Sequence, residues 1–275
     1  MRSLTSFVAG LVAVVAALVA VPMLWVSAHV ADEDGYVAFS SELASDAELQ
    51  GAFADYLAYD LVARGILPQR LQEVTGKALA VVSRTTASQP GFAEAWGETQ
   101  RSLHTSAFDD TTGPVTVEIS PIASFLAERL GDRLPVTLSI PSGLRAPVAS
   151  EQDRSDIAPL GHAGTWGLLA LLVSVVAAAV SFFSARSRPL ALAGLGLGAL
   201  AVAGILRLGT SVVTPRVLDR APDQSEFART LQELLVDRAA DSLGGWLAAT
   251  AVCGGVVLVL GLAGRALMGR PARQV

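Results

Sequence analysis

The feature that most constrains the fold is a pair of apolar runs, 164–184 and 190–207, joined by a short basic tip. The only charge within either run is Arg207, at its very end. At a rise of about 1.5 Å per residue, roughly 20 residues cross a hydrocarbon core of about 30 Å. One central arginine would cost about 2.5 to 3.5 kcal/mol, so the absence of charge predicts two transmembrane helices. The tip carries Arg186 and Arg188, which places it on the cytoplasmic side.

Two further apolar runs predict a first span over 5–29 and a fourth over 244–264. Hydrophobic residues make up 52% of the chain and charged residues only 16%, which excludes one ordinary soluble domain. The first run has a second interpretation, because Val26-Ser27-Ala28 resembles a signal-peptide cleavage site. We favour a retained span, since the run is longer than the roughly 7 to 15 apolar residues of a secretory signal.

The distribution of charge predicts how these spans are oriented. The three segments expected inside hold no acidic residue and six arginines, namely Arg2, Arg186, Arg188, Arg265, Arg270 and Arg273. All 25 acidic residues lie elsewhere, in the segments expected outside. Trp25, Trp166 and Trp246 each lie near the expected outer end of a span. The prediction is a multi-pass plasma-membrane protein with both termini, including the tail 265–275, in the cytoplasm.

The largest segment expected outside, 31–160, predicts a mostly helical extracytoplasmic domain. After a short helical stretch over 36–43, a helix is expected to begin at a Ser45–Glu48 capping box and to end at Gly65. Two more helices are expected after Pro68 and Pro90, with apolar stripes at helical spacing. The expected stripes are Leu49, Phe53, Tyr56, Leu57 and Leu61; then Leu71, Val74, Ala78 and Val81 or Val82; then Phe92, Trp96, Leu103 and Ala107.

The rest of the outside sequence predicts a small βαβ element and one isolated helix. Apolar residues alternate over 115–119 and 134–140, with a helical pattern over 121–131 between them, so two parallel strands are expected. The stretch 141–159 reads as a polar connection to the second span. In the second outside segment, 208–243, a helix with an apolar stripe is expected, separated from the fourth span by Gly244 and Gly245. We expect the larger domain to cover that stripe, which consists of Phe227, Leu231, Leu234 and Leu235.

The chain resembles a family of four-span integral membrane proteins of actinobacteria. The resemblance rests on Phe92, Trp96, Arg101 and His104 in the pattern F-x3-W-x4-R-x2-H, and on VTVEISPIASFLAERL from residue 115. It implies four spans with a large extracytoplasmic domain between the first two, and it implies no activity. Where the family has a longer glycine-containing loop after the β stretch, this chain has only GDR at 131–133.

The candidate binding residues are Arg101 and His104, one turn apart on an expected helix. Their functional interpretation is a base or a ligand for a polar headgroup, and their structural interpretation is a histidine satisfied by its neighbours. No catalytic residue, metal site or cofactor is predicted, because His29 and His162 lack a second ligand at helical spacing and no GxSxG, GxGxxG or Walker sequence occurs. Asp109-Asp110 reads as a polar turn rather than as a calcium loop.

Three functions fit these observations. The favoured one is a non-enzymatic protein that binds a membrane-protein or cell-envelope partner through its outside domain. The second is an accessory subunit of a membrane complex, with the Gly194–Gly198 pair packing against a sister helix. The third is an envelope-modifying enzyme that uses Arg101 and His104. The expected partners are therefore the lipid bilayer and a protein or envelope component, and no nucleic acid.

Overall fold

The computed structural model describes residues 2–65, 69–86, 89–109, 112–131, 140–218 and 225–268. The chain forms two compact units. The first comprises 1–27, 162–216 and 238–275, and the second comprises 28–161 and 217–237. Among the described residues, four helices are long and apolar enough to cross a membrane, which confirms the predicted class of multi-span α-helical membrane protein.

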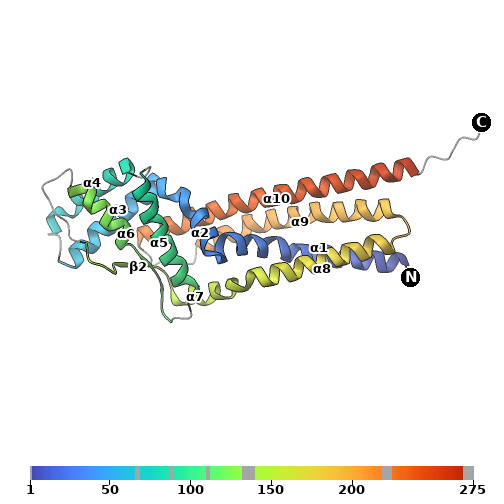
Figure 1. The fold of residues 1–275 in the computed structure, drawn as a ribbon, viewed down its shortest axis with the longest axis horizontal. Coiled ribbons are helices and arrows are strands. Elements are labelled where there is room, and N and C mark those ends of the chain that lie inside the picture. The colour runs from blue at the N-terminus through green and yellow to red at the C-terminus, as the bar shows by residue number, and fades with distance from the viewer. Residues whose placement is uncertain are drawn as a thin grey trace, which may run out of the picture. The chain divides into compact units, whose positions relative to one another are not determined.

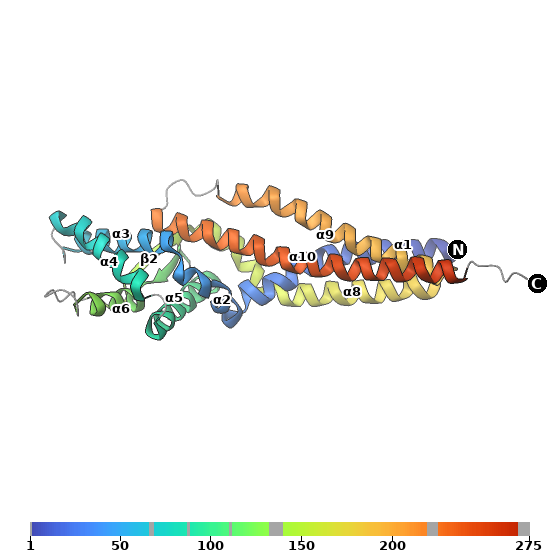
Figure 2. The same ribbon diagram turned by 90° about the horizontal axis from the view of Figure 1, so that it is seen from above.

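Most of the length of these four helices lies in the first unit, where they run side by side in both ribbon views (Figures 1 and 2). They are α1 (Arg2–Val26), α8 (Ala163–Ser184), α9 (Arg188–Leu218) and α10 (Glu226–Met268). Helix α9 continues well past the expected end at residue 207. Helix α10 runs through Gly244 and Gly245, so the predicted break there is wrong. Each glycine costs about 1 kcal/mol relative to alanine, which is too little to stop a helix with long apolar segments on both sides.

The exposed apolar side chains of these helices indicate which solvent surrounds them. In the most apolar window of each helix only 11 to 22% of the residues are buried. On α8, the exposed side chains include Leu168, Leu171 and Val173, which point in several directions around the helix. Apolar helices exposed on most sides are stable in lipid and not in water.

Helices α1 and α8 are joined by a reciprocal pair of serine hydrogen bonds. Ser6 Oγ donates to the Ser181 carbonyl and Ser181 Oγ donates to the Ser6 carbonyl, both at 2.8 Å. About two turns further along the pair, Ser174 Oγ donates to the Ala13 carbonyl at 2.9 Å. The two helices therefore run antiparallel. Hydrogen bonds of this kind between membrane helices contribute about 0.6 to 2 kcal/mol each.

Helices α9 and α10 approach each other through glycines. A Cβ at Gly254 would lie 2.8 Å from Ala199 Cβ, and a Cβ at Gly196 or Gly261 would collide with the backbone of the facing helix. Gly194 and Gly198 do not pack against one common helix of this chain, because a Cβ at Gly194 would meet no described atom within 4 Å while Gly198 lies against Val14 of α1. Neighbouring glycines thus serve different helices, since residues two apart point to different sides.

The second unit is mainly helical and contains a two-stranded sheet (Figure 1). Its helices are α2 (Glu33–Ser40), α3 (Ala47–Ala63), α4 (Gln72–Thr86), α5 (Pro90–Phe108), α6 (Ser120–Gly131), α7 (Glu151–Ile157) and the first residues of α10. The π-helical turn η1 (Ser27–Ala31) and the 3-10 turns η2 (Ser41–Ser45), η3 (Gln69–Leu71) and η4 (Ala158–His162) connect them.

Helix α3 begins one residue later than the predicted capping box. Asp46 is its N-cap, and Asp46 Oδ1 accepts hydrogen bonds from the backbone N–H groups of Glu48 and Leu49, both at 2.9 Å. Ser45 instead donates to the Glu42 carbonyl at the end of η2. The predicted stop is confirmed, because Gly65 follows α3 with a φ of 71°.

The sheet differs from the predicted βαβ element. Strand β1 (Val115–Glu118) is where the alternation predicts it, but it pairs with β2 (Arg145–Ala149) in antiparallel register. The predicted second strand falls mostly in 132–139, outside the described residues. Strand β2 lies in the stretch that reads as a polar connection, because only Ala146 and Val148 of its five residues are buried, one on each side of Pro147. Two buried residues are too weak a pattern to mark a strand.

The apolar core of the second unit includes the start of α10. The rings of Phe53 and Tyr56 on α3 lie 5.5 and 5.7 Å from the ring of Phe227, and Phe227 and Leu231 are buried. Gln232 Nε2 donates to the Val148 carbonyl of β2 at 3.0 Å. The prediction that the larger domain covers this stripe is therefore confirmed.

Candidate functional site

His104 lies on α5 in a pocket of aromatic rings. Its ring centroid is 4.8 Å from that of Phe108 and 5.7 Å from that of Tyr36. Its Nε2 lies 3.2 Å from the carbonyl oxygen of Ala31, so with Nε2 protonated the imidazole donates to that carbonyl. The ring is half-buried. The ring of His104 thus contacts Tyr36 of α2, and its Nε2 holds α5 to Ala31 at the end of η1.

Arg101 lies one turn earlier on α5 and reaches the same short segment. Its Nε is 3.8 Å from Glu33 Oε1, with about half of each side chain exposed. An exposed pair at that distance contributes at most about 1 kcal/mol. Between the two contacts, Asp32 caps α2 by accepting from the Gly35 N–H at 2.7 Å. The structure therefore brings Arg101 and His104 to one place, the junction at residues 31–33.

Close to Arg101 and His104, buried side chains join α2 and α5 through hydrogen bonds. The Tyr36 hydroxyl donates to Gln100 Oε1 at 3.0 Å, and Trp96 Nε1 donates to the Ser40 carbonyl at 3.1 Å. Burial raises the pKa of Tyr36 well above its ordinary value, which keeps the phenol protonated. A protonated donor of this kind holds a structure together and does not act as a base near neutral pH.

The chemical capacity of this region is consequently small. No group of three or more potential metal ligands occurs among the described residues. The Nε2 atom of His104, the hydroxyl of Tyr36 and the Nε1 atom of Trp96 are each engaged with a protein group. The arrangement fits a structural role better than a catalytic one.

Arg154 is an organising residue that the sequence analysis missed. It lies on α7 with 8% of its surface exposed, and it donates to three backbone carbonyls, those of Gly113 at 2.9 Å, Pro114 at 3.1 Å and Asp109 at 3.3 Å. It thereby fixes the turn between α5 and β1. No sequence signal separates this arginine from others in a polar stretch.

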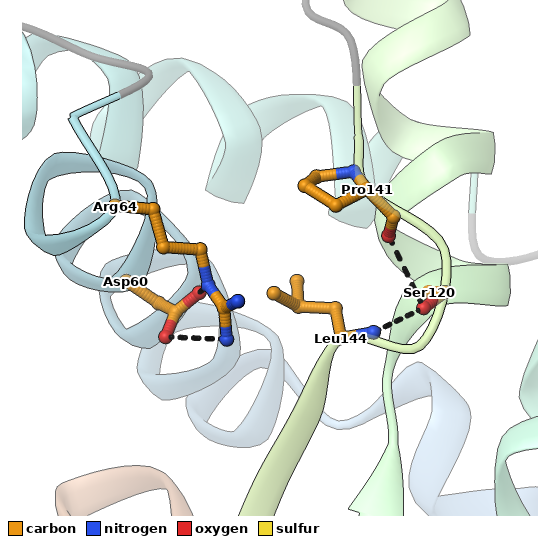
Figure 3. A network of polar contacts seen from close by, with 5 residues as sticks. All are labelled: Asp60, Arg64, Ser120, Pro141 and Leu144. Carbon is orange, nitrogen blue, oxygen red and sulfur yellow. Dashed lines mark hydrogen bonds and ion pairs between the residues drawn. The ribbon is translucent and has the colours of Figure 1, made fainter.

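A second polar contact joins β2 to α6 (Figure 3). Ser120 Oγ accepts from the Leu144 N–H at 2.8 Å and donates to the Pro141 carbonyl at 3.5 Å. The fully buried Leu144 side chain points toward Asp60 and Arg64, which form an ion pair of 2.5 Å on α3. Because Ser120 also begins α6, it links the helix, the turn and the strand.

The exposed apolar face of α4 is the most unusual surface of the second unit. We call it the α4 surface and define it as Leu71, the last residue of η3, together with Val74 and Val81 of α4; they are 42, 66 and 53% exposed. These residues belong to the stripe that the sequence predicts to be buried. That prediction is wrong for these three residues and right for the alternative Val82, which is buried, because α4 turns its other side to α3.

The buried side of α4 is formed by Leu79, Val82 and Gly76. A Cβ at Gly76 would lie 2.6 Å from Asp55 Oδ1 and 3.6 Å from Ala58 Cβ, so the absence of a side chain lets α4 approach α3 closely. Glu73 and Lys77 flank the α4 surface and form an exposed pair at 2.5 Å. Their hydrogen bond lowers the pKa of Glu73 and raises that of Lys77, so both stay charged at neutral pH.

Comparisons with protein families, with curated proteins and with solved structures found no match for this chain. The resemblance to the actinobacterial four-span family stays a prediction. The function must be inferred from the structure itself.

Proposed function

We propose that this chain is a non-enzymatic, multi-pass plasma-membrane protein whose second unit lies outside the cytoplasm and binds a protein partner through the α4 surface. The observation that carries the binding role is the exposure of Leu71, Val74 and Val81. Three large aliphatic residues on one exposed face are unfavourable on an extracytoplasmic helix that faces only water, and such a face marks an interaction site.

The spacing of the α4 surface supports a helical or grooved protein partner. Leu71, Val74, Ala78 and Val81 follow one another at intervals of three, four and three residues. This is the pattern with which an amphipathic helix lies in an apolar groove or against another helix. The charged pair Glu73–Lys77 beside it would form a polar rim.

The orientation is supported by charge. The turn between α8 and α9 carries Arg186 and Arg188, and α10 ends shortly after Arg265, with no acidic residue nearby in the sequence. The second unit holds most of the acidic residues. The positive-inside rule then assigns the turn and both termini to the cytoplasm and the second unit to the other side.

The enzyme alternative is weaker because its two residues already have structural partners. His104 is engaged with Ala31 and two rings, and Arg101 pairs with Glu33. Both residues stabilise the start of α2, which accounts for their positions without a substrate.

The proposal is tested by photo-cross-linking in intact cells. A photoreactive amino acid at Val74 or Val81 should capture one defined protein, whereas the same group at Ser124, exposed on α6, should not. The capture at Val81 should be lost in Val74→Glu and retained in Ala93→Glu, a matched change at an exposed alanine of α5. Equal capture from Val74 and Ser124, or no capture from the α4 surface, would contradict the binding role.

A further inference from the structure

A groove of about 530 Å³ lies between α1, α8 and α9, next to the turn that joins α8 to α9. Its walls are apolar and include Phe7 and Leu11 of α1 and Leu190 of α9, each more than half exposed. Its other end is polar and is formed by Ser3, Arg186 and Ser187. The groove therefore matches an amphipathic ligand, because it has apolar walls for an apolar chain and a polar end for a polar headgroup.

The groove has a defined depth. It closes where Gly198 of α9 lies against Val14 of α1. From Ser3 to Val14, helix α1 rises by roughly 16 Å at 1.5 Å per residue. That length is about half of the roughly 30 Å hydrocarbon core, which is the thickness of one leaflet.

Within the part of the chain that the structure describes, the positive charge at the polar end has no acidic partner. Helices α1, α8 and α9 contain no Asp or Glu. Of the ion pairs that the described residues form, none involves Arg186, which is exposed and lines the groove. Arg188 lies beside it, with its guanidinium carbon 5.9 Å from the centre of the Phe182 ring. A guanidinium group matches the geometry of a phosphate by donating two parallel hydrogen bonds.

We propose that this groove binds one anionic phospholipid, with an acyl chain between α1 and α9 and the phosphate at Arg186. The groove length matches one leaflet, and the Arg186 guanidinium, which forms no ion pair with any described residue, matches an anionic headgroup. The topology proposed above places the site in the cytoplasmic leaflet, where anionic lipids attract basic groups, but the binding itself does not depend on that orientation.

The test uses the purified full-length protein, delipidated in detergent and titrated with phosphatidylglycerol or with phosphatidylcholine of the same chain length. Native mass spectrometry measures the fraction of protein that carries one lipid. We expect a preference of about fivefold for phosphatidylglycerol, the factor expected for one arginine near an anionic surface. Arg186→Gln should abolish this preference. Arg207→Gln, which removes an arginine of α9 outside the groove, should preserve it.

The acyl-chain contact is tested by filling the groove. Gly194 lines the groove and Gly204 does not, yet both are exposed positions of α9 at which a Cβ would meet no atom within 4 Å. Gly194→Leu should lower phosphatidylglycerol binding at least fivefold, and Gly204→Leu should leave it unchanged. If Gly194→Leu does not fold, as judged by gel filtration and helical content, Ala191→Phe replaces it. This variant fills the same groove and should lower phosphatidylglycerol binding in the same way.

Three results would overturn the proposal. The first is equal binding of the two lipids by the unmodified protein. The second is an equal effect of the leucines at Gly194 and Gly204, which would indicate ordinary lipid contact around the helices. The third is displacement of phosphatidylglycerol by millimolar inorganic phosphate, which would indicate a simple anion site without a role for the acyl chain.

Discussion

Trp96 should stabilise the second unit far more than its neighbour on α5, His104. Trp96 is 7% exposed, and its Nε1 donates to the Ser40 carbonyl at 3.1 Å. Trp96→Ala removes a buried aromatic side chain, at about 3 to 5 kcal/mol, and leaves that carbonyl without its donor, at about 1 kcal/mol more. A total of about 4 to 6 kcal/mol is comparable with the whole stability of many domains, so this variant should be largely unfolded.

His104→Gln should be mild by comparison. The glutamine amide can still donate to the Ala31 carbonyl, and the half-buried ring loses only part of its contact with Phe108 and Tyr36. We expect a loss of about 1 kcal/mol. Trp96→Phe is the matched control for the hydrogen bond alone, because it keeps an aromatic ring and should cost about 1 to 3 kcal/mol.

The assay is pulse proteolysis of the full-length protein in detergent across a urea series, with cleavage inside the second unit as the readout. The predicted order of midpoints is unmodified protein, His104→Gln, Trp96→Phe and Trp96→Ala, from high to low. A His104→Gln midpoint as low as that of Trp96→Ala would refute this account of α5. A folded His104→Gln protein that loses cellular function while still capturing its partner at Val74 would favour a ligand or catalytic role for the histidine.

Three further predictions follow from particular contacts. Because burial raises the pKa of Tyr36 above its ordinary value of 10.0, the folded chain keeps a proton that the unfolded chain loses. The free energy of unfolding should therefore fall by up to about 1.4 kcal/mol per pH unit above about pH 10, and Tyr36→Phe should lessen that slope in urea titrations. Gly254→Ala should lower the thermal midpoint of the first unit, since its Cβ would lie 2.8 Å from Ala199 Cβ, whereas the adjacent Gly255→Ala, where nothing lies within 4 Å, should leave it unchanged or raised. Intact-mass analysis should find residues 1–28 retained, because Ser6 and Ala13 of α1 are hydrogen-bonded to α8, and a mature chain beginning at His29 would contradict this.

Much of the helical architecture is predictable from sequence because long apolar segments have few alternatives. Four runs without interior charge predict four membrane-length helices, and the structure has them. The stripe of Phe92, Trp96 and Leu103 is buried as expected, and so are Leu49, Phe53, Leu57 and Leu61 on α3. On each of these helices one face is clearly more apolar than the other, so the sequence pattern identifies the buried face.

The sequence does not predict the structure where two alternative arrangements are nearly equally favourable. Helix α4 is apolar on two sides, and the choice is decided by Gly76, whose missing side chain allows close contact with Ala58. Strand β2 has only Ala146 and Val148 to signal burial, and its pairing with β1 depends on contacts distant in sequence. The same holds for Arg154, whose partners at Asp109, Gly113 and Pro114 lie about 40 residues earlier in the chain.

The candidate site was located by sequence only in part. Arg101 and His104 do come together at the start of α2, as their spacing on one helix suggests. Their partners Glu33 and Ala31 are roughly 70 residues away, so the structural nature of the contact is visible only in the fold. The α4 surface was identified as a stripe, but its exposure was not, since periodicity locates an apolar face without saying what covers it.

The central claim, that the second unit and the turn between α8 and α9 lie on opposite sides of a membrane, is tested most directly by cysteine labelling in intact cells. The background is Cys253→Ser, which removes the only cysteine. A membrane-impermeant maleimide should label Ser124→Cys, exposed on α6, in intact cells and should label Ser187→Cys, half-buried in the turn, only after permeabilisation. Labelling of Ser187→Cys in intact cells, with Ser124→Cys protected, would contradict the account.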